Sequence, residues 1–187
     1  MHGDNISIYP KAAPIRLLLT DCDGVLTDGG VYYSAHGEEL KRFSLRDGMG
    51  VERLREIAGV ETGIVTGENS PIVAQRATKL GITELHLGAK NKVLVLLNVL
   101  QSRGLRPEEV AYIGDDLNDE GVMRRVGLCA CPADAQEGIL KIADYICLQP
   151  GGHGAFREFA ELIIYLKSQP HSPPVSASNS HPHPAGH

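Results

Sequence analysis

The sequence predicts a doubly wound α/β domain built on a parallel sheet, with a β-hairpin inserted after the first strand. Short apolar segments alternate with amphipathic segments between residues 15 and 167, as in a parallel sheet with helices on both faces. The first segment is apolar at consecutive positions, which is typical of a strand buried on both sides. Several segments end directly in polar residues, where such folds bind ligands.

Each element has its own signal. The first strand ends at Thr20, and the segments 30–34 and 40–44 flank the turn 35–38 of a hairpin. We expect Asp47 to cap the next helix, Ser70 and Pro71 to start another, and Gly81 to end it. The remaining elements are expected as strands at 62–65, 84–87, 110–113, 128–131 and 145–148, and as helices at 92–103, 119–126, 134–142 and 155–166.

Three parts follow along the chain. Residues 1–14 form an N-terminal extension, 15–167 the α/β domain and 168–187 a tail. Five of the 11 prolines and four of the eight histidines lie in 170–187. This composition predicts a disordered tail rather than a folded metal site.

Composition excludes several classes of function. The net charge is −5 with no basic cluster, so nucleic acid is not expected as a partner. No apolar stretch is long enough to span a membrane, and the first ten residues lack the features of a signal peptide. The four cysteines are expected as buried, reduced thiols, which indicates a cytoplasmic protein: Cys22, Cys129, Cys131 and Cys147.

Two carboxylates directly follow the first strand. In the functional interpretation, Asp21 attacks phosphorus to form an aspartyl-phosphate. Asp23 protonates the leaving alkoxide and then accepts a proton from water. Gly24 lets the chain turn sharply. Taken alone, this segment favours a polar loop with an Asx turn.

Two further groups are expected at the same edge of the sheet. Thr66, followed by Gly67, ends the second core strand and is suited to hold phosphoryl oxygens. Lys92 begins a helix and would neutralise the charge of the nucleophile. Each signal is weak alone, since such residues are common in turns and on surfaces.

The segment from Gly114 to Asp119 carries three carboxylates after a predicted strand. Asp115, together with Asp21 and the backbone carbonyl of Asp23, would bind Mg²⁺, which prefers oxygen ligands. The alternative is an acidic cap of the following helix, and both interpretations are compatible. The four groups at their predicted positions jointly favour a phosphomonoester hydrolase.

These motifs resemble those of the haloacid dehalogenase-like superfamily, over about residues 15–167. The lack of a long insertion resembles the capless subgroup. Within it, the chain is similar to 3-deoxy-D-manno-octulosonate 8-phosphate phosphatases and their sialic-acid-pathway relatives, on four stretches: FSLRDGMGVERL, NKVLVLLNVL, EEVAYIGDDLND and GGHGAFREFAEL.

The resemblance implies a homotetramer in which the hairpin lies at a subunit interface. It also implies that the glycine-rich segment Gly151 to Gly154 reaches toward a neighbouring active site. In that setting the substrate is a small sugar-acid phosphate.

One residue departs from the octulosonate pattern. Those enzymes usually carry Arg after the Thr-Gly pair, whereas this chain has Glu68. With Arg76 and Lys79, it resembles phosphatases for nine-carbon acid 9-phosphates, which we slightly favour. Gly67, Glu68, Arg76 and Lys79 are then the expected substrate-binding residues, although all three charged side chains are equally typical of a solvated surface.

A non-catalytic function stays open. The chain also resembles the tetramer-forming domains attached to CMP-sialate synthetases. Such domains tend to lose the motif carboxylates, whereas this chain keeps Asp21, Asp23, Lys92 and Asp115.

Overall fold

A computed structural model describes residues 8–169, and the predicted tail lies almost entirely outside them. Six parallel strands form the main sheet in the order β5-β4-β1-β6-β7-β8. The strands are β1 (Leu17–Thr20), β4 (Glu61–Val65), β5 (Glu84–His86), β6 (Val110–Ile113), β7 (Leu128–Cys131) and β8 (Tyr145–Ile146). The predicted doubly wound fold is confirmed.

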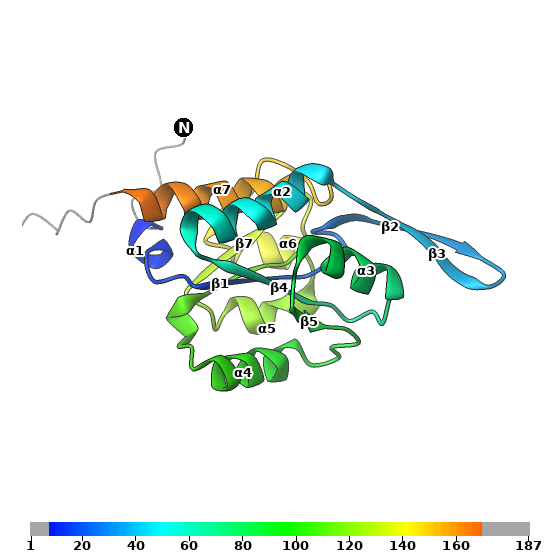
Figure 1. Ribbon diagram of the computed structural model, residues 1–187, viewed down its shortest axis with the longest axis horizontal. Coiled ribbons are helices and arrows are strands. Elements are labelled where there is room, and N and C mark those ends of the chain that lie inside the picture. The colour runs from blue at the N-terminus through cyan, green and yellow to red at the C-terminus, as the bar shows by residue number, and fades with distance from the viewer. Residues whose placement is uncertain (1–7, 170–187) are drawn as a thin grey trace, which may run out of the picture.

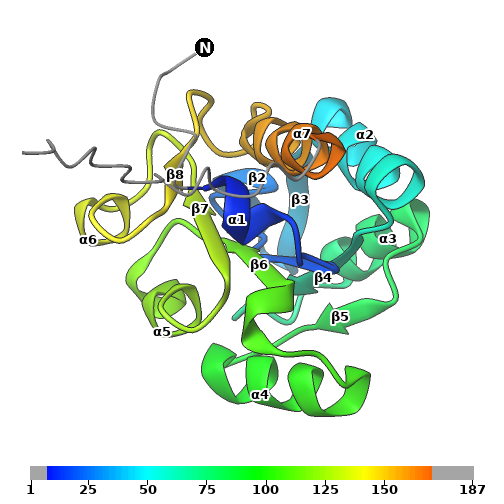
Figure 2. The ribbon, with the colours of Figure 1, turned by 90° about the vertical axis from the view of Figure 1, so that its left-hand side faces the viewer.

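Helices cover both faces of the sheet (Figure 2). One apolar core joins the sheet to α1 (Tyr9–Ala12), α2 (Leu45–Arg53) with the π-helical turn Leu54–Ala58, α3 (Pro71–Leu80) and α7 (Ala155–Ser168). The other core joins it to α4 (Lys92–Arg103), α5 (Glu120–Met123) and α6 (Glu137–Leu140). Leu17 and Leu19 face the second core and Leu18 the first, so the three leucines of β1 are buried on both faces of the sheet.

The hairpin of β2 (Thr27–Ser34) and β3 (Gly37–Phe43) forms a separate antiparallel pair. It extends well beyond the body of the domain (Figure 1). Its side chains are largely exposed, including Tyr32, Tyr33 and Leu40. The predicted hairpin insertion is therefore present, and its outer part has little of this chain to pack against.

Several predicted boundaries need correction. Ser44, not Asp47, caps α2, because its hydroxyl accepts the N–H groups of Arg46 and Asp47. The helix predicted at 119–126 is a 3-10 turn (Leu117–Asp119) followed by the single turn of α5. The helix predicted at 134–142 is also shorter in the structure, where only α6 (Glu137–Leu140) is helical. A further 3-10 turn covers Pro107–Glu109.

Two predictions from composition can be compared with the described residues. All four cysteines are buried free thiols, as predicted. Across residues 8–169, no helix combines the length and apolarity needed to cross a membrane. Ile8 and Ala12, from the predicted N-terminal extension, are buried in the first core.

Candidate active site

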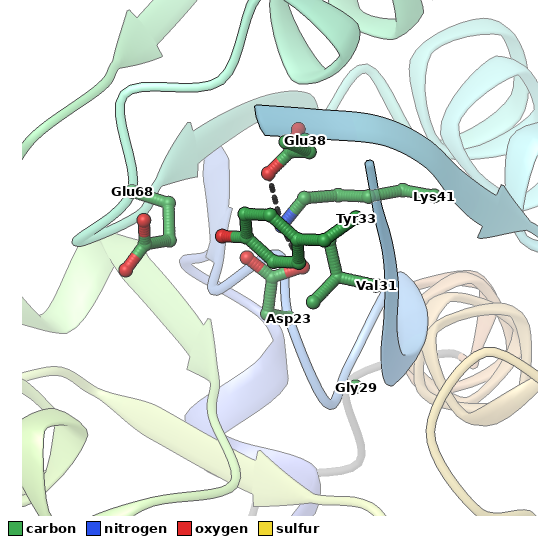
Figure 3. A pocket seen from close by; sticks show the side chains of 7 residues that line it. All are labelled: Asp23, Gly29, Val31, Tyr33, Glu38, Lys41 and Glu68. Atoms are coloured by element: carbon green, nitrogen blue, oxygen red, sulfur yellow. Dashed lines mark hydrogen bonds and ion pairs between the residues drawn. The ribbon is translucent and has the colours of Figure 1, made fainter. Parts of the chain in front are cut away.

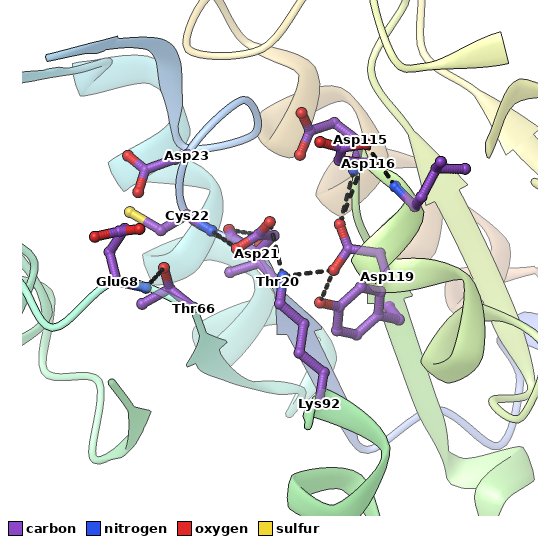
Figure 4. Close-up of polar contacts among 12 residues, drawn as sticks. Thr20, Asp21, Cys22, Asp23, Thr66, Glu68, Lys92, Asp115, Asp116 and Asp119 are labelled. Atoms are coloured by element: carbon purple, nitrogen blue, oxygen red, sulfur yellow. Dashed lines mark hydrogen bonds and ion pairs between the residues drawn. The ribbon is translucent and has the colours of Figure 1, made fainter. Parts of the chain in front are cut away.

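The order of the strands explains how distant motifs meet. β1 lies at the centre of the sheet between β4 and β6, and the chain winds outward from it in both directions. Asp21, Thr66 and Asp115 therefore follow three adjacent parallel strands at their carboxyl ends (Figure 4). This is the point where doubly wound sheets bind ligands.

Asp21 is held from two sides. Its Oδ1 accepts the N–H of Cys22 at 2.7 Å, and its Oδ2 lies 2.8 Å from Nζ of Lys92. Its own N–H donates to the carbonyl of Ile113, which ties the loop to β6. The carboxylate is only 5% exposed, so it is fixed in direction before any substrate arrives.

Asp119 supports this arrangement from beneath. It is fully buried, and its Oδ1 accepts Nζ of Lys92 at 2.7 Å and the hydroxyl of Tyr112 at 2.5 Å. Its Oδ2 accepts the N–H groups of Asp115 at 3.1 Å and Asp116 at 3.3 Å. Asp119 therefore orients Lys92 and the following loop together.

The carboxylates of Asp21, Asp115 and Asp119 lie within 4.8 Å of one another. Four donors already occupy Asp119, whereas the buried Oδ1 of Asp115 finds no hydrogen-bond partner among the described residues. A carboxylate oxygen that is buried and free is what a hard cation such as Mg²⁺ requires. The residues present therefore fit the predicted metal, with Asp21 and Asp115 better suited to bind it than Asp119.

Glycine is required beside this cluster. Gly24 has φ +86°, and a Cβ there would lie 2.0 Å from Oδ2 of Asp115. Any larger residue would strain the backbone and displace the carboxylate.

The charges at the site are unbalanced without a metal. Burial, reinforced by the charge of Asp119 and opposed by Lys92, raises the pKa of Asp21 to about 7. Burial and the charges of Asp21 and Asp119 raise the pKa of Asp115 to about 8. Burial opposes the charge of Lys92, but the two carboxylates beside it outweigh burial and raise its pKa. One ammonium faces three carboxylates, so a divalent cation would complete the charge balance.

Thr66 is 1% exposed, and its hydroxyl accepts the N–H of Glu68 at 3.3 Å. A Cβ at Gly67 would meet no atom within 4 Å. The space above this turn is open, as a site for phosphoryl oxygens would require.

A pocket of about 220 Å³ lies beside Asp23 (Figure 3). It is lined by Asp23, Gly29, Val31, Tyr33, Glu38, Lys41 and Glu68. Glu68 is thus one predicted substrate-binding residue that the structure brings to the site. The pocket joins the catalytic loop, the hairpin and the turn after β4.

Arg76 and Lys79 do not line this pocket. Arg76 donates to the carbonyl of Ser44 at 2.9 Å and lies 5.5 Å from the ring centroid of Phe43. Lys79 lines a different depression with Gly48 and other residues. Within one subunit, the structure gives neither side chain a place beside Glu68.

Sequence reasoning missed the cation that does line the pocket, Lys41. It lies on an exposed hairpin where charges are ordinary, so no pattern marked it. Tyr112 was also missed, because a tyrosine within an apolar strand resembles any core aromatic. The structure places its hydroxyl on Oδ1 of Asp119, the same oxygen that accepts Lys92.

The glycine-rich segment packs against its own subunit. Gly151 donates its N–H to Asp134 and Gly152 donates to the carbonyl of Val25. A Cβ on Gly151 would lie 1.8 Å from the carbonyl oxygen of Gly24. The first two glycines therefore support the loop that carries Asp21 and Asp23.

Comparisons with known proteins agree with this geometry. A family model described as haloacid dehalogenase-like hydrolase matches residues 35–127. The chain is 43% identical over 162 residues to the 3-deoxy-D-manno-octulosonate 8-phosphate phosphatase of Escherichia coli, covering 87% of this chain and 86% of that one.

Solved structures give the same picture. The 3-deoxy-D-manno-octulosonate 8-phosphate phosphatase from Yersinia pestis matches with a TM-score of 0.83 and 41% identity, covering 87% of each chain. The enzyme of that name from Moraxella catarrhalis, solved with a magnesium ion, a phosphate ion and a KDO molecule, matches with a TM-score of 0.84 and 36% identity. It covers 88% of this chain and 94% of that one.

These findings decide the class of protein. Family membership and the acidic cluster support the predicted cofactor, Mg²⁺. The intact cluster and the enzymatic relatives favour an enzyme over a non-catalytic assembly domain. The chain belongs to the haloacid dehalogenase-like hydrolases, in the group of the octulosonate 8-phosphate phosphatases, and is a phosphoric monoester hydrolase.

Proposed function

We propose that this enzyme hydrolyses the terminal phosphate ester of a 2-keto-3-deoxy sugar acid through an aspartyl-phosphate on Asp21. The observation that carries the proposal is the buried Asp21 carboxylate, fixed by Lys92 at 2.8 Å and adjoining Asp115 and its free oxygen. This arrangement suits attack on phosphorus better than attack on carbon. The Lys92 ammonium, and a cation bound by the carboxylates beside it, would hold an anionic phosphoryl group next to Asp21.

Two half-reactions follow from the two carboxylates. An oxygen of Asp21 bonds to phosphorus while the ester P–O bond breaks, and Asp23 gives its proton to the leaving alkoxide. Water then bonds to phosphorus while the bond to Asp21 breaks, and Asp23 accepts the proton of that water. Inorganic phosphate is released and both carboxylates return to their starting states.

The other residues stabilise charge. Lys92 would neutralise Asp21 before attack, and Thr66 with the N–H groups after it would bind phosphoryl oxygens. Asp21, Asp115 and the backbone carbonyl of Asp23 would hold Mg²⁺, whose charge, when bound, offsets the phosphoryl oxygens.

We propose 3-deoxy-D-manno-octulosonate 8-phosphate as the substrate, because relatives of that name cover most of this chain. A nine-carbon 9-phosphate is the second candidate, and its support is Glu68, which lines the pocket beside Asp23. A carboxylate there suits additional hydroxyls of a longer sugar chain.

A kinetic experiment tests both statements. Asp21→Asn should remove nearly all turnover in Mg²⁺ while its thermal melt stays cooperative, and substantial residual kcat would refute the nucleophile. The parent enzyme should prefer the eight-carbon over the nine-carbon phosphate. Glu68→Arg should increase that preference, with Glu56→Arg on an exposed helical turn as the control. An unchanged ratio in Glu68→Arg would show that Glu68 does not contact the sugar.

We also propose that the enzyme assembles as a homotetramer through the hairpin. Exposed fractions of 65% for Tyr32, 68% for Tyr33 and 62% for Leu40 support this, since contiguous exposed apolar surface marks interaction sites. Sedimentation should give about four times the 20.1 kDa of one chain. Tyr32→Asp with Leu40→Asp should lower that mass, and a parent protein that sediments as a monomer would refute the assembly.

A further inference from the structure

The hairpin reaches back into the active site through one side chain. Nζ of Lys41, on β3, lies 2.6 Å from Oδ1 of Asp23. Only 3% of the Lys41 side chain is exposed, although the strand around it is largely open to solvent. Figure 3 shows Lys41 directed toward Asp23 along one wall of the pocket. A buried ammonium at the predicted general acid requires an explanation.

The two oxygens of Asp23 have different surroundings. Oδ1 accepts Lys41 and also the hydroxyl of Thr27 at 3.2 Å. Oδ2 is buried and finds no hydrogen-bond partner among residues 8–169. One oxygen is therefore anchored by two donors, and the other is left available. A carboxylate that must exchange a proton with a substrate oxygen needs this asymmetry, because an oxygen already bonded to donors cannot approach another group.

Lys41 is itself held in place. Oε2 of Glu38 lies 3.6 Å from its Nζ, and Oε1 of Glu38 accepts the hydroxyl of Ser70. Ser70 occupies the cap position of α3, yet its side chain makes no cap hydrogen bond. The side chains thus form a chain of contacts from α3 through the hairpin to Asp23.

We propose that Lys41 is a positioning residue, which fixes the rotamer of Asp23 so that Oδ2 faces the leaving-group oxygen. Lys41 acts through Asp23 and need not touch the substrate. The proposal rests on the proposed role of Asp23 as the general acid. It also gives the hairpin a catalytic task, since a shift of β3 would carry Lys41 away from Asp23.

The test uses two substrates that differ in their need for an acid. p-Nitrophenyl phosphate has a good leaving group and needs little protonation, whereas an alkyl phosphate such as a sugar-acid phosphate needs it. Lys41→Met should lower kcat/KM for the alkyl ester roughly 10- to 100-fold, since small misplacements of catalytic groups cost that much. The comparison uses kcat/KM because it covers only the steps up to release of the leaving group, whereas both esters share the later hydrolysis of the aspartyl-phosphate. Its kcat/KM for the aryl ester should fall less than about threefold, because a good leaving group needs little protonation. KM for the alkyl ester should stay close to that of the parent.

Three variants make the result decisive. Lys41→Arg should restore part of the alkyl-ester kcat/KM, because a donor to Oδ1 is retained. Lys141→Met removes an exposed lysine directly after α6. It should leave the kinetic constants for both esters unchanged. Lys41→Met with Glu38→Gln avoids leaving the Glu38 carboxylate without its cation. It should change kcat/KM for the two esters as Lys41→Met does, and thermal melts check that the fold is kept.

Asp23→Asn separates the two proposals. If Asp23→Asn spares the aryl ester and slows the alkyl ester, but Lys41→Met slows both equally or acts only on KM, the positioning role of Lys41 is refuted. If Asp23→Asn itself lowers kcat/KM equally for both esters, the acid role is refuted, and the inference about Lys41 is overturned with it.

Discussion

Asp119→Asn is the substitution for which the structure gives the clearest magnitude. The carboxylate accepts four donors at once, from Lys92, Tyr112 and the backbone of Asp115 and Asp116. An asparagine keeps the shape but has only one oxygen, and its NH₂ group is a donor. The oxygen should turn toward the ammonium of Lys92, leaving the NH₂ group against the two backbone N–H groups.

The cost can be worked from these contacts. Two partly buried N–H groups lose their acceptor, at up to about 1–3 kcal/mol each. Breaking a buried ion pair at one partner costs about 3–5 kcal/mol. With Mg²⁺ bound, three carboxylates balance one ammonium and one divalent cation, so the variant also carries an excess positive charge. We expect the free energy of unfolding in Mg²⁺ to fall by about 3–5 kcal/mol, since these effects overlap.

Urea denaturation in saturating Mg²⁺ at pH 7 measures this change. Asp116→Asn is the matched control: the same substitution in the same loop, at an exposed residue whose capping bond to Leu117 an asparagine also makes. The control should change stability by less than about 1 kcal/mol. Magnesium affinity should fall only in Asp119→Asn, because the loop carrying Asp115 loses its support. A loss below about 1 kcal/mol in Asp119→Asn would refute the reasoning.

Two more predictions concern the metal and the glycine loop. In chelator, Asp21 and Asp115 hold protons up to about pH 7 and 8, whereas unfolded Asp releases them near pH 3.9. The folded state then binds more protons, so its stability should fall as pH rises from about 4 to about 8, and Mg²⁺ should restore it most at pH 8. A melting temperature in EDTA that increases over this range would contradict this. Gly151→Ala should cost about 2 kcal/mol or more in urea denaturation, because its Cβ meets the backbone of Gly24. Gly138→Ala, which meets only the flexible end of a leucine, is the control, and equal stability of the two variants would argue against a tight contact.

The active-site core could be predicted from the sequence because each member marks the end of an element. Asp21 and Asp115 follow strands whose apolar runs are unmistakable, and Lys92 opens a helix closed by Gly104. In a doubly wound sheet, parallel strands bring these ends to one edge. Local pattern and topology were therefore sufficient to predict that Asp21, Lys92 and Asp115, the proposed nucleophile, cation and metal ligand, lie together.

The boundaries of short helices were less predictable. Ser44 and Asp47 are both good capping residues three positions apart, and only the backbone conformation decides between them. Asp47 is instead buried and accepts the N–H of Arg157 at the start of α7. That contact joins residues 110 positions apart, so no local signal announces it.

The sequence by itself determined the class of this protein, a phosphoric monoester hydrolase, whereas the tertiary structure decided which charges line the pocket beside Asp23. Arg76 and Lys79 were candidates because they follow Glu68 along the chain, but Arg76 is bonded to Ser44. Lys41 was overlooked because an exposed strand gives no periodic signal, yet the hairpin's path brings it to Asp23. Motifs at strand ends are positioned by the repeating geometry of the sheet, which sequence patterns encode. A side chain on a projecting hairpin is positioned by contacts between distant segments, and these exist only once the chain has folded.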